Sequence, residues 1–249
     1  MTSSPAPTQS ERAQRQREIV QALSACVPQH ALLWQSEDTT PYECDGLTAY
    51  RQRPLVVCLP ETEDEVRAVL KTCHALQVPV VARGAGTGLS GGAMPHAMGV
   101  TLSLAKFNRI LDVDPVSRTA RVQCGVRNLA ISEAAAPYGL YYAPDPSSQI
   151  ACTIGGNVAE NSGGVHCLKY GLTVHNVLRV RGFTMEGEPV TFGSEALDAP
   201  GYDLLAAVIG SEGMLAVALE ATVRLIPSPQ LARCIMASFD DVRKAGDAV

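Results

Sequence analysis

The sequence lacks the features that mark metal-binding, disulfide-rich and membrane-spanning proteins. Its eight cysteines include no C-x-x-C pair and lie mostly inside apolar runs, which favours buried, reduced thiols over disulfides, an iron–sulfur cluster or another metal site. No apolar run approaches the roughly eighteen residues that a transmembrane helix needs. Residues 1–9 are polar and contain no signal-peptide core, so we expect a cytoplasmic protein without a transmembrane segment.

Basic and aromatic residues are also scarce. The 20 Lys and Arg residues are outnumbered by 25 Asp and Glu residues, which leaves a net charge of -5. Because no basic stripe is present to release counterions from a polyanion, the composition argues against a nucleic-acid partner. Only 5% of the residues are aromatic but 46% are hydrophobic, so the 249 residues are enough to build an aliphatic core, in one large domain or in two lobes.

The most distinctive stretch is residues 83–93, in which five glycines follow the apolar run 78–82. Glycine reaches positive φ without steric cost and lets a ligand approach the main chain, so such a loop suggests backbone N–H groups that converge on an anion such as a diphosphate. Arg83 adds a positive charge, and Thr87 and Ser90 add hydroxyl donors that suit phosphate oxygens. A glycine-rich surface turn is the alternative interpretation.

Two familiar nucleotide motifs do not fit this stretch. Residues 86–91 satisfy G-x-G-x-x-G, and Asp112 lies at about the right distance for a ribose contact, as in an NAD-dependent Rossmann enzyme. A Rossmann fingerprint must open a helix, however, and Pro95 and the β-rich run 99–104 leave no room for one. A phosphate-binding Walker loop is excluded because no Lys-Ser or Lys-Thr follows the glycines.

The remaining periodicity predicts an α+β protein with two lobes. Strands are expected at 55–59, 78–82 and 100–104, with a helix from the Thr62/Glu65 capping box to about residue 76 that makes a βαβ unit. From about Lys106 the pattern changes to antiparallel hairpins. The other predicted elements are helices at 10–27, 128–136, 202–209 and 239–249, strand pairs at 109–114 with 118–123 and 177–185 with 189–192, and a strand that ends near 226.

A second group of glycines, amides and hydroxyls occupies residues 141–148 and 153–164. We expect a short helix there whose N-terminal N–H groups face an anion. Two anion-binding loops in one chain suggest a long ligand held between the two lobes.

The order of these motifs closely resembles that of FAD-linked oxidases of the vanillyl-alcohol oxidase type. The resemblance is carried by residues 83–92, 144–148, 153–157 and 210–213, within a region from about 54 to 229. It implies an α+β, two-lobe PCMH-type FAD-binding domain with a small βαβ lobe and a larger, mainly antiparallel lobe with helices. The implied boundaries are an N-terminal helix and wrapping segment at 1–53, the FAD-binding domain at 54–230 with lobes of about 54–105 and 106–230, and the start of a truncated C-terminal substrate domain at 231–249.

The resemblance also implies where FAD binds. Residues 83–89 would wrap the diphosphate, residues 153–157 and 161–164 would line the ribityl and diphosphate path, and the segment around Glu212 would lie near the adenosine half. Met214 and Ala216 depart from many relatives, and we expect altered packing there without loss of binding. The implied cofactor-binding residues are Arg83, Gly84, Ala85, Gly86, Thr87, Gly88, Leu89, Pro144, Asp145, Ser148, Thr153, Gly155, Gly156, Asn157, Asn161, Gly163, Gly164, Glu212, Gly213 and Val217.

Histidine bears on how the flavin is held. Some members of the family attach FAD to a histidine in the glycine loop, but residues 83–92 contain none, so we predict non-covalent FAD. His96 is expected in an exposed turn. For His166 and His175 we expect structural hydrogen bonds, with an approach of His166 to the flavin ring as the alternative.

For activity, the resemblance implies oxidation of a 2-hydroxy acid of the glycolate or D-lactate type, with hydride transfer from the α-carbon to FAD. In relatives the catalytic base and the metal-binding histidines lie in a second domain, so we assign no catalytic residue and no metal site here. The implied partners are a homologous flavin subunit and an iron–sulfur electron-acceptor subunit, through which the protein would associate with a membrane. The alternative is an FAD-binding module that is inert on its own within a larger complex.

Overall fold

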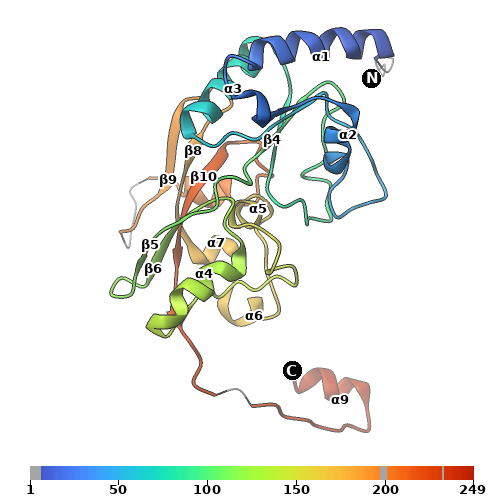
Figure 1. Cartoon of the computed structure of the whole chain (residues 1–249). Helices are drawn as coiled ribbons and strands as arrows, with labels where there is room; N and C mark the ends of the chain where they lie inside the picture. Colours follow the sequence, from blue (N-terminus) through green and yellow to red (C-terminus); the bar gives the residue numbers. More distant parts are fainter. Residues whose placement is uncertain (1–6, 197–200, 232) are drawn as a thin grey trace.

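The structure is a computed structural model that describes residues 7–196, 201–231 and 233–249. It contains a smaller four-stranded sheet and a larger five-stranded sheet, and the strands of the larger sheet run along the left side of the body in Figure 1. Helices α1 (Gln9–Leu23) and α3 (Glu63–Ala75) cover the smaller sheet at the top of that view. The mixture of helices and sheets is the α+β architecture that the sequence predicts.

The smaller sheet has the strand order β1-β2-β4-β3. Strand β2 (Val56–Cys58) and strand β3 (Val80–Arg83) both pair in parallel with β4 (Val100–Ser103), and β1 (Leu32–Leu33) pairs antiparallel with β2. The predicted βαβ unit is therefore present, with β4 inserted between its two strands.

Helix α3 begins at the capping box that the sequence predicts. The Thr62 hydroxyl accepts a hydrogen bond from Glu65 N at 3.2 Å, and the Glu65 carboxylate accepts one from Thr62 N at 3.3 Å. The helix buries Val66, Val69, Leu70 and Cys73. These are the side chains that the helical spacing assigns to the sheet.

The larger sheet has the order β5-β6-β10-β8-β9 and is antiparallel throughout. Two of its pairs, β5 (Ile110–Asp114) with β6 (Thr119–Gln123) and β8 (Val177–Phe183) with β9 (Pro189–Gly193), are the predicted hairpins. Strand β10 (Val217–Arg224) comes later in the chain but lies between β6 and β8.

Shorter elements complete the fold. The strand predicted to end near 226 is divided into β10 and β11 (Ile226–Pro227), and β11 pairs with β7 (Leu140–Tyr141). Helices α4 (Asn128–Ala135), α8 (Leu204–Val208) and α9 (Val242–Asp247) lie where helices are expected. The pattern does not reveal the single-turn helices, because one turn is too short to show a 3.6-residue period. They are α2 (Ser36–Thr39), α6 (Cys167–Tyr170), α7 (Thr173–Asn176) and 3-10 turns at Gln29–Ala31, Thr40–Tyr42 and Ala136–Tyr138.

Two apolar cores hold these layers. One joins α1, α3 and the smaller sheet, and it also takes in Phe183, Val217 and Leu219 from the larger sheet. The other packs α4 and α5 (Ile154–Glu160) against β6, β8 and β10. Because the first core contains side chains from both sheets, the sheets are packed directly on one another at that point.

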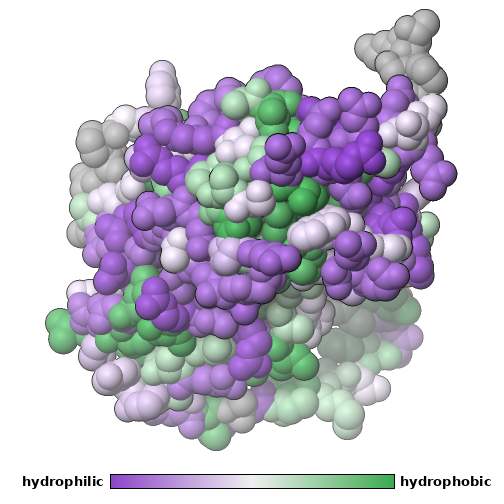
Figure 2. Space-filling model, turned by 45° about the horizontal axis from the view of Figure 1, so that its top comes forward, coloured by the Kyte–Doolittle hydropathy of each residue, from purple (hydrophilic) through white to green (hydrophobic). Residues whose placement is uncertain are grey.

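The surface differs between the body and the C-terminal segment. Hydrophilic residues cover most of the face that carries α1 and α3, with apolar patches between them (Figure 2). The chain after β11 leaves the body (Figure 1). Its exposed apolar side chains include Ile235, Met236 and Val242. Over the described ranges, we find no helix with the length and apolarity to cross a bilayer.

Candidate functional site

A cavity of about 340 Å³ lies where the two sheets meet. Three segments form its walls: the glycine loop after β3, the segment that leads into α5, and residues 211–218 before and in β10. The sequence-predicted residues that line it are Arg83, Gly84, Ala85, Gly86, Thr87, Gly88, Leu89, Ser148, Thr153, Gly155, Gly156, Asn157, Glu212, Gly213 and Val217. The tertiary structure thus gathers most of the predicted site into one place.

Five predicted residues do not line this cavity. The carbonyl of Pro144 accepts a hydrogen bond from the Asn128 side chain at 3.1 Å. The Asn161 side chain accepts one from Val174 N at 3.0 Å. The remaining three are Asp145, Gly163 and Gly164. An added Cβ at Gly164 would overlap Asp145, so these two segments are in close contact. Cofactor contact stays a prediction for these five residues and for the fifteen that line the cavity.

The glycines of the loop allow side chains of α5 and its N-cap to approach the loop backbone closely. A Cβ at Gly84 would overlap the Thr153 hydroxyl, and one at Gly88 would lie 2.5 Å from a Glu160 carboxylate oxygen. Gly86 has φ +70°, which favours glycine. The loop therefore needs glycine for two reasons: one position has a positive φ angle, and two others lie too close to side chains of the opposite wall to carry a Cβ atom.

The wall opposite the loop begins at the N-terminus of α5. Thr153 caps this helix and accepts a hydrogen bond from Gly156 N at 3.4 Å. The N–H groups of Ile154 and Gly155 donate to the Val126 and Cys124 carbonyls at 2.8 Å, so the first N–H groups of the helix are bonded within the protein and do not face an anion as the sequence led us to expect. The buried Asn157 amide oxygen accepts a hydrogen bond from Asn128 Nδ2 at 3.0 Å. Because Asn128 belongs to α4, the helix that carries Asn157 is held against a second helix, and the cavity wall is fixed before any ligand binds.

Two carboxylates meet over the loop. A Cβ at Gly92 would overlap Glu212 and lie 3.5 Å from Glu160 Oε1, so both side chains reach the same glycine. Glu160 also accepts a hydrogen bond from Ser90 Oγ at 3.3 Å. Burial raises the pKa of Glu212, and the nearby charges of Glu160 and Asp45 raise it further.

Glu160 is a site residue that the sequence does not assign. It lies at the end of α5, seven residues after Thr153, and no short motif distinguishes it from an ordinary solvent-facing glutamate. Other unassigned residues supply hydroxyls and apolar surface to the cavity. They are Ala82, Gly92, Ala93, Leu104, Cys124, Ser147, Cys152, Val158, Ala159, Ser162, Val208, Ser211, Ala216 and Ala218.

In each of the three histidines considered from the sequence, the ring nitrogen Nδ1 makes a hydrogen bond within the protein. His96 Nδ1 accepts from Met98 N at 3.1 Å, and His175 Nδ1 accepts from Leu172 N at 3.0 Å. His166 Nδ1 lies 2.6 Å from an Asp145 carboxylate oxygen. Across the three described ranges, no group of three or more His, Cys, Asp or Glu side chains has the arrangement of a metal site.

These residues fit FAD by their chemistry. A glycine loop with free backbone surface and hydroxyl groups suits a diphosphate, since closely approaching N–H groups are the donors that anions prefer. The cavity also has apolar walls from Val158, Val208, Ala216 and Val217 that suit a ring system.

Comparison with known proteins agrees with this assignment. The chain is 63% identical over 231 residues to the glycolate oxidase subunit GlcD of Escherichia coli K12, which covers 93% of this chain and 46% of that protein. It is 39% identical over 209 residues to GlcD of Bacillus subtilis, covering 84% and 44% of the two chains. The chain therefore spans about half the length of the curated relatives it matches.

A structural comparison identifies the fold, and a family model identifies the family. A solved structure of alkyldihydroxyacetonephosphate synthase superimposes with a TM-score of 0.75 at 22% identity, over 93% of this chain and 42% of that one, which bears on the fold alone. A family model described as the FAD binding domain matches residues 54–193, more than half of the 249 residues. The resemblance seen in the motifs is thus confirmed, and the chain belongs to the PCMH-type family of FAD-binding domains.

Proposed function

We propose that this chain is the FAD-binding part of a flavin-dependent oxidoreductase that acts on a 2-hydroxy acid of the glycolate or D-lactate type. The observation that carries the proposal is the cavity between the two sheets, lined by the glycine loop, the start of α5 and residues 211–218. The identity of 63% to a glycolate oxidase subunit supports the choice of substrate class. A module that binds FAD but is inert on its own is the alternative.

In this proposal the chain binds and orients the cofactor. FAD, when bound, supplies a two-electron acceptor for the hydride of the substrate α-carbon. The glycine loop would hold the phosphate groups through its backbone N–H groups, with the Thr87 and Thr153 hydroxyls beside them. The Asn128 to Asn157 hydrogen bond keeps the α5 wall in place, and the aliphatic side chains of the cavity would exclude water from a ring bound against them. We assign no catalytic base.

We propose that FAD is held non-covalently, because residues 83–92 contain no histidine. The domain boundaries given above, 1–53, 54–230 and 231–249, are part of the same proposal. Because the E. coli relative is named as a subunit, we further propose partner subunits, a homologous flavin subunit and an iron–sulfur acceptor subunit, for a cytoplasmic protein that reaches a membrane through them.

The cofactor site is tested by titrating the purified chain with FAD and following flavin fluorescence. We expect saturable binding, and all flavin in the supernatant after acid precipitation. Gly86→Val should abolish binding, because valine is strained at φ +70° and its side chain would enter the space of the Arg83 guanidinium. Gly246→Val is the matched control, since no atom lies within 4 Å of a Cβ there. Flavin that stays with the precipitate would contradict non-covalent binding.

The substrate class is tested by anaerobic bleaching of the FAD-loaded protein with glycolate, D-lactate and L-lactate. The same assay on a chimaera, in which this chain replaces the matched 46% of E. coli GlcD, separates the two functional hypotheses. Bleaching by glycolate or D-lactate in both proteins supports an active chain. Bleaching in the chimaera alone supports the inert module, and none in either protein contradicts the substrate class.

A further inference from the structure

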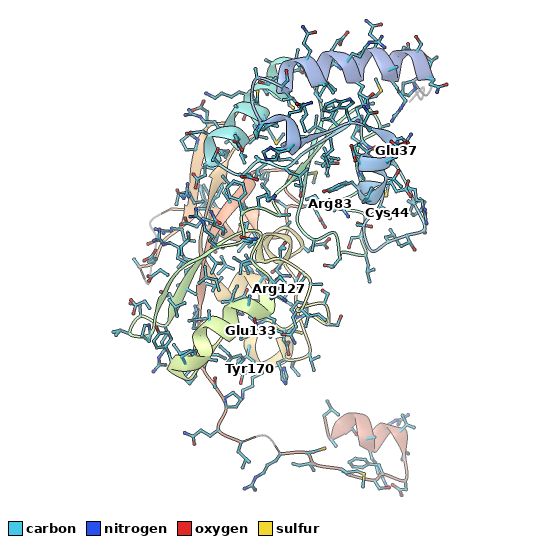
Figure 3. All side chains as sticks on the ribbon, in the orientation of Figure 1. Glu37, Cys44, Arg83, Arg127, Glu133 and Tyr170 are labelled. Carbon is cyan, nitrogen blue, oxygen red and sulfur yellow. The ribbon has the colours of Figure 1, made fainter. Side chains whose placement is uncertain are left out.

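The segment 42–46, which we name the N-terminal strap, packs against the glycine loop. Its Cys44 carbonyl accepts a hydrogen bond from Arg83 Nη1 at 2.9 Å, and Figure 3 shows these two residues side by side. The Arg83 guanidinium carbon lies 5.7 Å from the centre of the Tyr42 ring. A Cβ at Gly46 would lie 2.7 Å from the Gly88 carbonyl oxygen. The strap thus touches both the first residue of the loop and its middle.

The Arg83 side chain makes its hydrogen bonds within the protein. It is only 8% exposed, and its Nη1 also donates to the Ala93 carbonyl at 3.3 Å, at the other end of the loop. A Cβ at Gly86 would overlap the guanidinium. The side chain therefore lies within the curve of the loop and joins both of its ends to the strap, a geometry that differs from the phosphate contact expected from the sequence.

Asp45 supplies a negative charge on the strap. Burial lowers the pKa of Arg83, and the charge of Asp45 opposes that shift. Asp45 is 4% exposed, and its Oδ1 accepts from Leu47 N at 2.8 Å. Its Oδ2 has no hydrogen-bond partner among the side chains and backbone that the structure describes. A buried carboxylate oxygen without a hydrogen-bond partner is costly, so the strap keeps Asp45 at an energetic cost.

We propose that the N-terminal strap is part of the FAD site, although it precedes residue 54, where the match to the family begins. The strap holds the glycine loop in its binding shape through Arg83 and Gly46, and in this way raises the affinity for FAD without touching it. Arg83 is then a positioning residue. The inference rests on the proposed placement of FAD at the loop. Its physical basis is that a loop ordered before binding does not lose that conformational freedom when the ligand arrives.

The test is Gly46→Ala, with Gly246→Ala as the matched control. The backbone of Gly46 is open to alanine, but the added Cβ would lie 2.7 and 2.9 Å from the Gly88 and Thr87 carbonyl oxygens and must displace the loop. We expect hydrogen exchange of the amides of residues 84–93, measured without FAD, to become at least tenfold faster, and the Kd for FAD to rise at least fivefold. Exchange in β10 should not change, and the control should match the wild type in both measurements.

Arg83→Lys separates positioning from direct phosphate binding. Lysine keeps the charge but lacks the fork that reaches both the Cys44 and Ala93 carbonyls, so the proposal expects fast exchange and weak FAD binding. If Arg83 bound the diphosphate as a charge, lysine would retain most of the affinity, and the proposal would be overturned. The proposal also fails if Gly46→Ala leaves loop exchange and Kd unchanged.

The proposal can still be tested if Gly46→Ala does not fold or if the wild-type chain does not bind FAD. If Gly46→Ala does not fold, Asp45→Asn replaces it, because asparagine keeps the acceptor for Leu47 N and removes the charge. We expect Asp45→Asn to speed hydrogen exchange of the amides of residues 84–93. Tighter FAD binding with unchanged exchange would contradict the proposed role of the strap. If the wild-type chain itself does not bind FAD, the proposed cofactor site has failed, while exchange in the unliganded protein still decides whether the strap orders the loop.

Discussion

Arg181 on β8 binds the carboxylate of Glu63, the first residue of α3, with both Nη atoms, at 2.7 and 2.5 Å. The pair joins the helix over the smaller sheet to a strand of the larger sheet. Hydrogen bonds from Arg181 lower the pKa of Glu63 against the opposing effect of burial. The pair therefore ties the two layers together at a point outside the cavity lining.

The first prediction concerns this pair. Glu63→Gln should lower the free energy of unfolding by about 0.5–1 kcal/mol, a modest value because the side chains are 40% and 35% exposed. The folded-state pKa of Glu63 is depressed, so its contribution is complete above its ordinary pKa and is lost as pH falls through the lower folded value. Urea unfolding of both proteins at neutral pH and near pH 3 measures this difference.

Glu188→Gln is the control for the Glu63 variant. Lys71 and Glu188 also join α3 to the β8–β9 hairpin, at 3.2 Å, but they are 47% and 61% exposed. We expect a smaller loss there. An equal loss of unfolding free energy in the two variants would show that the Arg181–Glu63 pair stabilises the protein no more than the exposed Lys71–Glu188 pair does.

The second prediction concerns Glu220, whose side chain on β10 is 7% exposed. Its carboxylate lies 3.2 Å from Arg181 and 3.8 Å from both Arg121 and Arg179. Glu220→Ala should destabilise the protein by about 2–4 kcal/mol, because three guanidinium groups would remain together without their shared anion. Glu195→Ala, which removes the exposed partner of Arg179, should cost less than about 0.5 kcal/mol. Urea unfolding measures both, and similar losses would contradict the shared-anion role.

The third prediction separates two neighbouring glycines of α5. A Cβ at Gly155 would lie 2.7 Å from Cys124 Cβ and 2.9 Å from the Cys124 carbonyl oxygen, whereas one at Gly156 would meet only Thr153 Oγ1, at 3.5 Å. Gly155→Ala should therefore cost about 2 kcal/mol or more, through overpacking. Gly156→Ala should be neutral or stabilise by up to about 1 kcal/mol, because alanine is the better helix former. Thermal unfolding of the unliganded variants tests this, and the reverse order would refute the packing argument.

The fourth prediction uses the raised pKa of Glu212. In the folded state its ionisation is opposed by burial and by Glu160, so a cost to stability develops as pH rises through its ordinary pKa and is complete above the raised one. Glu212→Gln should remove this cost and make the unliganded protein more stable near pH 7 than the wild type, with the difference vanishing near pH 3. Melting temperatures across this pH range provide the measurement, and a less stable variant at pH 7 would contradict the sign.

Much of the local structure is predictable because its causes lie close together in the chain. Thr62 and Glu65 are three residues apart, so their reciprocal hydrogen bonds are visible in the sequence as a capping box. Hairpin partners are likewise adjacent in sequence, which is why β5 with β6 and β8 with β9 are found as expected. The glycine loop is recognised for the same reason, since its composition alone requires an unusual backbone.

The sequence by itself therefore determines the helices longer than a single turn, the hairpins and the motifs that assign the chain to its family. The tertiary structure decided what it could not, namely that β10 enters the sheet between β6 and β8, that Glu160 and Glu212 meet at Gly92, and that Arg83 faces the Cys44 carbonyl, 39 residues away in the chain. The physical reason is that such contacts depend on how layers pack, and no short-range periodicity records which distant segments will share a buried space.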